Sequence, residues 1–212
     1  KIVHVSEAAR PNVNVASFTH SGDGQPAIAF SPDGVKVAIA STIVEVFSLF
    51  SQKQTGKTIK CGRADIVAFT ADGTHVMTAA RYGADCVEWD WTTGKSVKVL
   101  ATDKSYGRIT AFSPSGKLLV RRRRGRAEIV DVASDKIVTS FPVEGWSLDH
   151  LSISADEACF SYIDGGALHM RSIPKGEPLA APIRLGDSSS IAFDQKLPIV
   201  SSAPVAGTVR VW

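Results

Sequence analysis

One segment has the spacing of a phosphate site without its complete motif. Gly56 to Thr58 follows a hydrophobic strand, as the end of a phosphate-binding loop does, but Ser51 occupies the position where GxxxxGKT requires its first glycine. The same Thr-Gly-Lys triplet returns at 93–95. No helix is predicted after either triplet to offer its amino terminus to a phosphate. We therefore interpret both triplets as turns and predict no cofactor.

Catalytic and metal-binding patterns are also missing. Asp149 and His150 lie beside several serines, but the sequence contains no GxSxG elbow, and adjacent residues of a strand point to opposite faces. The histidines show no metal-ligand spacing with one another or with the cysteines. The five histidines are His4, His20, His75, His150 and His169. The sequence therefore predicts a protein that is not an enzyme, with no catalytic residue and no metal ligand.

Composition and charge indicate a globular domain. The 212 residues are 44% hydrophobic and 21% charged, and the net charge of +3 is too small to imply a nucleic-acid or membrane partner by itself. No apolar run reaches the roughly 18 residues of a spanning helix, and the first ten residues do not resemble a signal peptide. Three widely spaced cysteines, Cys61, Cys86 and Cys159, favour packed, reduced thiols. We expect a cytoplasmic or nuclear protein.

The elements that must position any site repeat along the chain. Trp89 ends a short strand and is followed by Asp90 and a polar turn at 91–95. Positions equivalent to Trp89 recur every 41 or 42 residues through the whole chain. A period of about 40 to 45 residues with strand content is typical of propeller blades. The equivalent residues are Val5, Phe47, Trp89, Val130, Arg171 and Trp212.

A second, independent marker has the same period. A strand that ends in an aromatic or aliphatic residue is followed by a turn such as Pro32-Asp33-Gly34, in which proline presets the turn, aspartate caps it and glycine takes a positive φ. Three further strands separate this marker from the next. Each period therefore predicts four antiparallel strands in up-and-down order. The marker residues are Phe30, Phe69, Phe112, Ile153 and Phe193.

The predicted fold class is all-β, a β-propeller of four-stranded antiparallel blades. About five blades are visible, and the chain forms either part of a larger, seven-bladed propeller or a five-bladed ring. We expect one array over 1–212. Its blades are a half blade at 1–18, full blades at 19–62, 63–103, 104–142 and 143–185, and an incomplete blade at 186–212.

The motifs resemble those of the WD40-repeat family of β-propellers. FSPDG at 30–34, WDWTTGK at 89–95 and VRVW at 209–212 carry the resemblance, which covers essentially the whole chain. The repeats are degenerate, and His20 is the nearest equivalent of the Gly-His pair that usually precedes the innermost strand. FSPDG alone would also fit TolB-like and initiation-factor-like propellers. The WDxxTG spacing favours the WD40 family.

The resemblance implies where a partner would bind. Arg121 to Arg126, a basic run of sequence RRRRGR, is predicted to lie at the hairpin between the second and third strands of its blade. In WD40 propellers this hairpin and the connection into the innermost strand share one face. The candidate partner-binding residues at such positions are Arg63, Arg81, Tyr82, Lys104, Tyr106, Arg108, Arg121, Arg122, Arg123, Arg124, Arg126 and Trp146.

Three functional interpretations remain open at this point. The first is a scaffold that binds a protein or peptide partner, including an acidic one, because arginine pairs with carboxylates and Tyr and Trp anchor interfaces. The second is direct binding of RNA or an anionic lipid by the basic run. In the third, the arginine run has no partner to bind: it is only a solvated hairpin, or it protects a sheet edge against aggregation.

Overall fold

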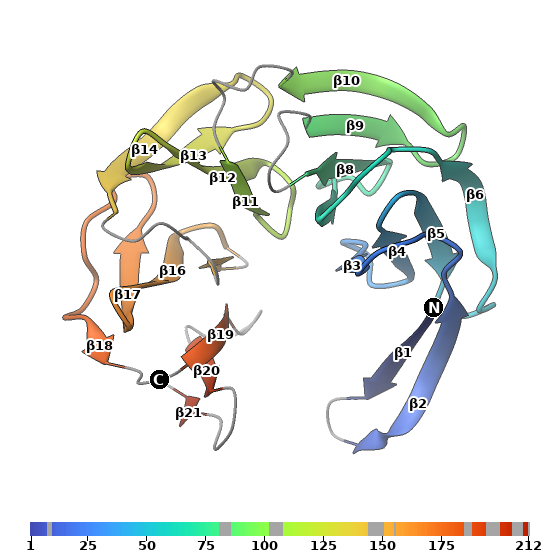
Figure 1. Cartoon of the computed structure of the whole chain (residues 1–212), viewed down its shortest axis with the longest axis horizontal. Coiled ribbons are helices and arrows are strands. Elements are labelled where there is room, and N and C mark those ends of the chain that lie inside the picture. Colours follow the sequence, from blue (N-terminus) through green and yellow to red (C-terminus); the bar gives the residue numbers. More distant parts are fainter. Residues whose placement is uncertain are drawn as a thin grey trace. The chain divides into compact units, whose positions relative to one another are not determined.

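The computed structural model describes residues 1–7, 10–80, 86–101, 108–143, 151–154, 156–184, 188–193, 200–204 and 210–211 (Figure 1). For 4–7, 10–15, 100–101, 108 and the residues from 188 onward it describes the backbone alone. Every regular element in these ranges is a strand. They contain no helix long and apolar enough to cross a membrane. The chain divides into two compact units, Lys1–Asp103 and Lys104–Trp212.

The first unit holds one two-stranded and two four-stranded antiparallel sheets. Strands that follow one another in sequence are neighbours in each sheet, which gives the up-and-down order expected of blades. The strands are β1 (Ile2–Glu7) and β2 (Arg10–Thr19); β3 (Ala27–Phe30), β4 (Lys36–Ala40), β5 (Val44–Ser48) and β6 (Gln54–Ile59); and β7 (Ile66–Phe69), β8 (His75–Ala79), β9 (Cys86–Asp90) and β10 (Lys95–Ala101).

The second unit repeats the same arrangement with two four-stranded sheets and one three-stranded sheet. Its strands are β11 (Arg108–Phe112), β12 (Leu118–Arg123), β13 (Arg126–Asp131) and β14 (Lys136–Pro142); β15 (Ser152–Ile153), β16 (Cys159–Asp164), β17 (Ala167–Ser172) and β18 (Ile183–Arg184); and β19 (Ser188–Phe193), β20 (Val200–Pro204) and β21 (Arg210–Val211). Four-stranded antiparallel blades of the β-propeller type confirm the predicted fold class. There are four complete blades among the described residues, where about five were expected.

The hairpin between the first two strands of a blade is closed by the predicted turn chemistry. Asp72 accepts hydrogen bonds from the Thr70 hydroxyl at 2.7 Å and from the Thr74 backbone N–H at 3.0 Å. Gly73 has φ of 70°, and Gly34 has φ of 68° in the preceding blade. A positive φ is costly for residues with a side chain, so glycine here sets where the chain reverses.

Consecutive blades of the first unit bury a shared apolar layer. Val67 and Phe69 of β7 belong to one buried cluster with Ala38 and Ala40 of β4. Phe69 is 1% exposed. Because strand residues alternate between the two faces of a sheet, each blade has a second face that needs its own cover.

The second unit packs its blades through aromatic rings. Phe141 of β14 lies against Phe160 of β16 with ring centroids 5.1 Å apart, and Tyr162 is 5.3 Å from Phe141. These rings join Val120 and Ile129 of the preceding blade in one buried cluster. Offset aromatic contacts of this kind add to the stability gained from buried area.

The loss of stability in acid tests whether the turn carboxylates stabilise the hairpins. Hydroxyl and backbone N–H donors lower the pKa of Asp33 and of Asp72 to about 2, against about 3.9 in an unfolded chain. A lowered folded-state pKa contributes stability that is fully present above about pH 4 and is lost as the pH falls towards about 2. We expect the urea midpoint of Asp72→Asn to fall less than that of the parent protein between these pH values. If the urea midpoints of the two proteins fell equally with pH, the stabilising role of the Asp72 carboxylate would be contradicted.

Candidate functional site

Three loops of the first unit meet at the same end of their blades. The hairpin between β4 and β5, the connection into β3 and the connection into β7 all lie there. The Ala64 backbone N–H donates to the Ser41 carbonyl at 2.6 Å, and the Asp23 backbone N–H donates to the Thr42 hydroxyl at 3.0 Å. These bonds hold both connections against one hairpin. The sequence-based expectation that the two kinds of loop share a face is confirmed within this unit.

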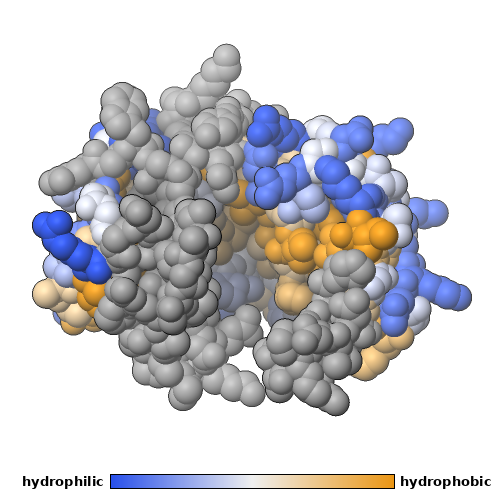
Figure 2. All heavy atoms as spheres, turned by 60° about the horizontal axis from the view of Figure 1, so that its bottom comes forward, coloured by the Kyte–Doolittle hydropathy of each residue, from blue (hydrophilic) through white to orange (hydrophobic). Residues whose placement is uncertain are grey.

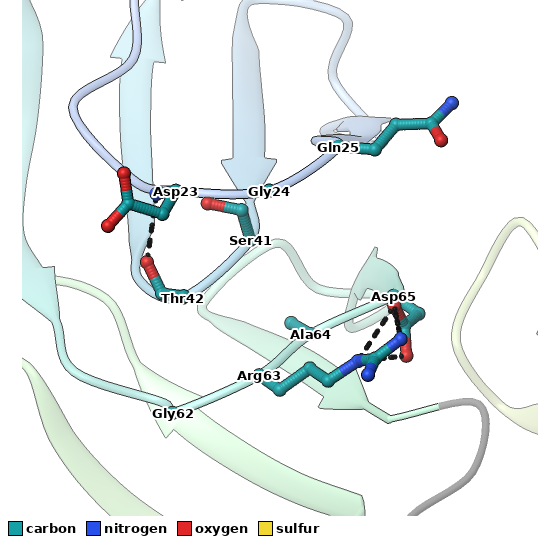
Figure 3. Close-up of a pocket in the computed structure, with 9 residues that line it drawn as sticks. All are labelled: Asp23, Gly24, Gln25, Ser41, Thr42, Gly62, Arg63, Ala64 and Asp65. Carbon is teal, nitrogen blue, oxygen red and sulfur yellow. Dashed lines mark hydrogen bonds and ion pairs between the residues drawn. The ribbon is translucent and has the colours of Figure 1, made fainter.

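A pocket of about 490 Å³ opens between these loops (Figure 3). Figure 3 shows Asp23 and Thr42 on one side of the pocket and the Arg63 and Asp65 side chains on another. Two glycines, Gly24 and Gly62, have φ of 88° and 81°, and a Cβ at either position would meet no atom within 4 Å. The lining residues are Asp23, Gly24, Gln25, Ser41, Thr42, Gly62, Arg63, Ala64 and Asp65.

Three charged side chains, Asp23, Arg63 and Asp65, line the pocket. Arg63 Nε lies 3.1 and 2.9 Å from the two Asp65 carboxylate oxygens, and Nη2 lies 3.0 Å from Oδ1. This forked pair neutralises one carboxylate. Asp23 makes no ion pair with any residue that the structure describes, and it adds a second carboxylate to the lining. The pocket is therefore suited to a hydrogen-bond donor or a cation.

A buried polar network is joined to the pocket through Ser41, which belongs to both. His20 is 1% exposed; its Nδ1 lies 2.7 Å from Glu45 Oε2, and its Nε2 lies 2.7 Å from Ser41 Oγ. Glu45 also accepts hydrogen bonds from the Ser21 backbone N–H at 3.1 Å and from the Ser21 hydroxyl at 2.5 Å. The network fixes the connection into β3 to the hairpin between β4 and β5, because each buried polar atom needs its partner.

Serine, histidine and a carboxylate in this order also have the connectivity of a hydrolytic triad. Ser41 is only 4% exposed, however. A Cβ on Gly22 would overlap Ser41 Oγ and would lie about 2.5 Å from His20 Nε2, so the Gly22 backbone itself covers these atoms. A substrate carbonyl would have to approach through that backbone. This packing favours a structural role for the network.

The second unit presents the basic hairpin at the equivalent point of its blade. Arg124 and Gly125 join β12 to β13, as predicted. Arg121 is buried instead of exposed, and its Nε lies 2.7 Å from Glu128 Oε2 on the neighbouring strand. Arg126 is exposed and donates to the Ser140 hydroxyl at 2.8 Å. Arg121 thus has a structural partner that the run of identical residues did not suggest.

The other residues of the basic run differ in exposure. Arg122 and Arg123 are half-buried and Arg124 is exposed. Arg108 is placed by backbone register alone, opposite Arg122. Five of the candidate partner-binding residues lie outside the described ranges: Arg81, Tyr82, Lys104, Tyr106 and Trp146.

Sequence reasoning found one residue of the pocket, Arg63, and missed the rest. The missed residues are mostly small and polar, with no motif of their own. Their place in the repeat is the usable signal: 23–25 precede the innermost strand of one blade as 62–65 precede that of the next. His20 was noted only as an equivalent of a family histidine, whereas the structure gives it two buried partners.

Thiol and metal chemistry find little support in the described residues. Cys86 is buried in β9, and burial raises the pKa of its thiol to about 12. Burial likewise raises the pKa of Cys61 to about 11. A thiol needs its thiolate form to react, so both are poor nucleophiles at neutral pH. Within the described ranges no three His, Cys, Asp or Glu side chains are grouped for a metal ion.

Comparison with known proteins assigns no family. No protein-family model matches the sequence, and no curated protein matches it. The β-propeller fold class therefore stands on strand order, pairing and packing.

The covered serine gives a direct chemical test of the network. We expect a fluorophosphonate probe, which reacts with activated serines, to leave Ser41 unlabelled in the folded protein. The backbone of Gly22 blocks the approach of the probe to Ser41 Oγ. Mass spectrometry of the treated protein measures this. Labelling that disappears in Ser41→Ala but persists in the control variant Ser51→Ala would contradict a structural role.

Proposed function

We propose that this chain is a non-enzymatic binding scaffold that docks a protein or peptide through the loop face that carries the pocket. The observation that carries the proposal is the convergence of three loops from two blades on one pocket. Loops on a rigid scaffold are where binding residues concentrate. The pocket has the volume of a ligand site, and its position at a junction between repeated units is common for such sites.

The pocket chemistry supports a peptide segment as its occupant. Gly24 and Gly62 leave backbone open beside the hollow, where a ligand backbone or side chain can approach closely. Asp23 supplies a carboxylate, and the exposed Thr42 contributes a hydroxyl group. A lysine, arginine or amide side chain of a partner would satisfy these acceptors. An acidic partner would instead be drawn to the exposed arginines of the β12–β13 hairpin.

We further propose that the blades are WD40-like. Trp89 Nε1 donates to the Thr78 hydroxyl at 2.9 Å, which fixes the marker tryptophan to the neighbouring strand. Asp90 accepts from the Thr92 and Thr93 backbone N–H groups at 2.8 and 3.2 Å and so closes the turn that follows. These contacts support a structural role for the WDxxTG motif. TolB-like and initiation-factor-like propellers remain the alternative, since the FSPDG turn is common to them.

Direct binding of RNA or anionic lipid is the weaker alternative. Its source would be the basic run, of which Arg121 is already committed to Glu128. Fewer available cations mean fewer phosphate contacts and a weaker dependence of affinity on salt. The pocket itself is lined by the carboxylates of Asp23 and Asp65, which would repel a phosphate.

A peptide-display experiment tests the proposed docking face. Peptides are selected on the intact chain from a displayed random library, and their affinities are measured by fluorescence anisotropy. We expect Asp23→Lys to weaken selected peptides by at least about tenfold, because it reverses the unpaired charge of the pocket; about 1.4 kcal/mol corresponds to that factor. Circular dichroism checks that the variant is folded.

The matched control is Lys53→Glu, an exposed charge reversal in the turn between β5 and β6. Its affinity should stay within about twofold of the parent, given the small effect of remote surface charges. The double variant Arg123→Glu/Arg124→Glu tests the basic hairpin in the same assay. Equal binding by the parent and Asp23→Lys would contradict the pocket as the docking point.

A further inference from the structure

The hairpin between β12 and β13 carries a surface of positive charge. Figure 2 shows hydrophobic surface on the right of the view, in the part of the molecule that holds β1 to β3 in Figure 1. The hairpin, in the second unit, is of a different kind: Arg123 is half-buried, and Arg124 and Arg126 are exposed. None of these three arginines forms an ion pair with a residue that the structure describes.

Strand register places two of the arginines opposite each other. Arg123 pairs with Arg126, and the turn of Arg124 and Gly125 joins them. Residues directly opposite in an antiparallel pair lie on one face of the sheet, with Cβ atoms about 4.5–5.5 Å apart. Like charges at this spacing are destabilising. An anion bound between the two side chains would remove the repulsion.

The glutamate on the same face of the sheet is already paired. Arg121 and Glu128 share this face with Arg123 and Arg126, because side chains two residues apart along a strand point the same way. Arg121 Nε lies 2.7 Å from Glu128 Oε2, and both residues are buried. Arg121 Nη1 lies 3.9 Å from Asp135 in the turn after β13, so this guanidinium extends away from the hairpin. The Arg121–Glu128 pair therefore does not neutralise the arginines nearer the turn.

Arg126 is held in place by groups that carry no charge. Its Nε donates to the Ser140 hydroxyl at 2.8 Å, and its Nη2 donates to the Ser140 carbonyl at 2.9 Å, both on the adjacent strand β14. The guanidinium is thus fixed in position while its positive charge remains. Its other N–H groups donate to no residue that the structure describes. A cation positioned in this way is preorganised for an anionic ligand, which lowers the entropy cost of binding.

We propose that Arg123, Arg124 and Arg126 form a binding site for the phosphate group of a phosphorylated partner polypeptide. A phosphoserine or phosphothreonine carries a charge of about −1.5 to −2 at pH 7 and offers three acceptor oxygens. Guanidinium groups bind such oxygens as bidentate forks. A carboxylate brings only one negative charge to the three arginines, so it compensates less of the repulsion between Arg123 and Arg126.

The extent of the positive surface favours one phosphate group over a nucleic acid. In the next blade of the second unit, the corresponding hairpin carries Asp164 followed by two glycines. Arg184 on the neighbouring strand β18 balances that carboxylate, so this blade adds no excess positive charge. Nucleic acids gain affinity from several cations spaced along their backbone. Within the described part of these two blades, the excess is confined to a single hairpin.

The site extends the proposed function and is separable from the pocket. It rests on the proposed function only in that a polypeptide carries the ligand. The pocket belongs to the first unit and is lined by Asp23, whereas the arginines belong to the second unit. Variants of each can therefore be compared in one binding assay.

A phosphopeptide titration of the intact chain tests the site. The probe is a short, fluorescently labelled peptide of glycine and alanine with one phosphoserine at its centre, and fluorescence anisotropy measures its affinity. We expect saturable binding of this peptide. The same peptide with glutamate in place of phosphoserine should bind at least about tenfold more weakly, because it has fewer charges and acceptor oxygens. The peptide with unmodified serine should not bind.

Arg123→Glu should weaken the phosphopeptide by at least about tenfold, because it removes one cation and adds a repelling carboxylate. Its melting temperature without ligand should stay at or above that of the parent, since glutamate would face Arg126 and end the repulsion. The matched control is Lys117→Glu, the same change of charge at an exposed position before β12, at the opposite end of the blade. Its affinity should stay within about twofold of the parent.

Equal phosphopeptide affinity of Arg123→Glu and the parent would overturn the site. So would inorganic phosphate that binds as tightly as the phosphopeptide, since the ligand would then be the free ion. Tighter binding of a single-stranded oligonucleotide, lost in Arg123→Glu, would assign the arginines to nucleic acid instead.

Asp23→Lys separates this inference from the proposed function. It should leave phosphopeptide affinity unchanged. Phosphopeptide binding that is lost in Asp23→Lys and kept in Arg123→Glu would overturn the arginine site and leave the pocket as the docking point. Phosphopeptide binding lost in Arg123→Glu, together with library-selected peptides that Asp23→Lys does not affect, would support the arginine site and contradict the pocket.

Discussion

Packing of one blade against the next is the constraint on which this structure depends. A four-stranded sheet is a single layer, and its two apolar faces cannot cover each other. Phe69 is buried only because the preceding blade lies over it, and Phe160 is buried by Phe141 of the blade before it. Sheet area removed from water in this way is the main source of stability. The repeat is therefore a thermodynamic requirement of the fold as well as a pattern in the sequence.

The same constraint explains where the candidate sites lie. Apolar packing occupies the blade faces, so polar residues gather at the strand ends, and the first unit forms its pocket there. His20 and Glu45 join a connection to a hairpin with hydrogen bonds that a packed apolar face could not supply. A site at the strand ends can vary without disturbing the core. Ile28 and Phe30 of β3 are exposed on a blade face, which belongs to the packing layer and is a different kind of surface.

The sequence was sufficient for the fold class because the repeat signals are local. Phe30 and Phe69 mark strand ends, and the turns after them need glycine at a positive φ. The pocket could not be predicted in the same way, because its lining depends on which loops meet across blades. Arg121 illustrates the limit: it is one of four consecutive arginines, yet register places Glu128 opposite it and buries the pair. A string of identical residues carries no information on that difference.

The most direct test of blade-on-blade packing compares one substitution at two equivalent positions. Phe69→Ala removes a ring that the neighbouring blade covers, and Phe30→Ala removes its repeat equivalent in β3, which is 52% exposed. The free energy of unfolding from urea titration should fall by about 3–5 kcal/mol for Phe69→Ala and by less than about 1.5 kcal/mol for Phe30→Ala. Equal losses at the two positions would contradict the claim that each blade draws its stability from its neighbour.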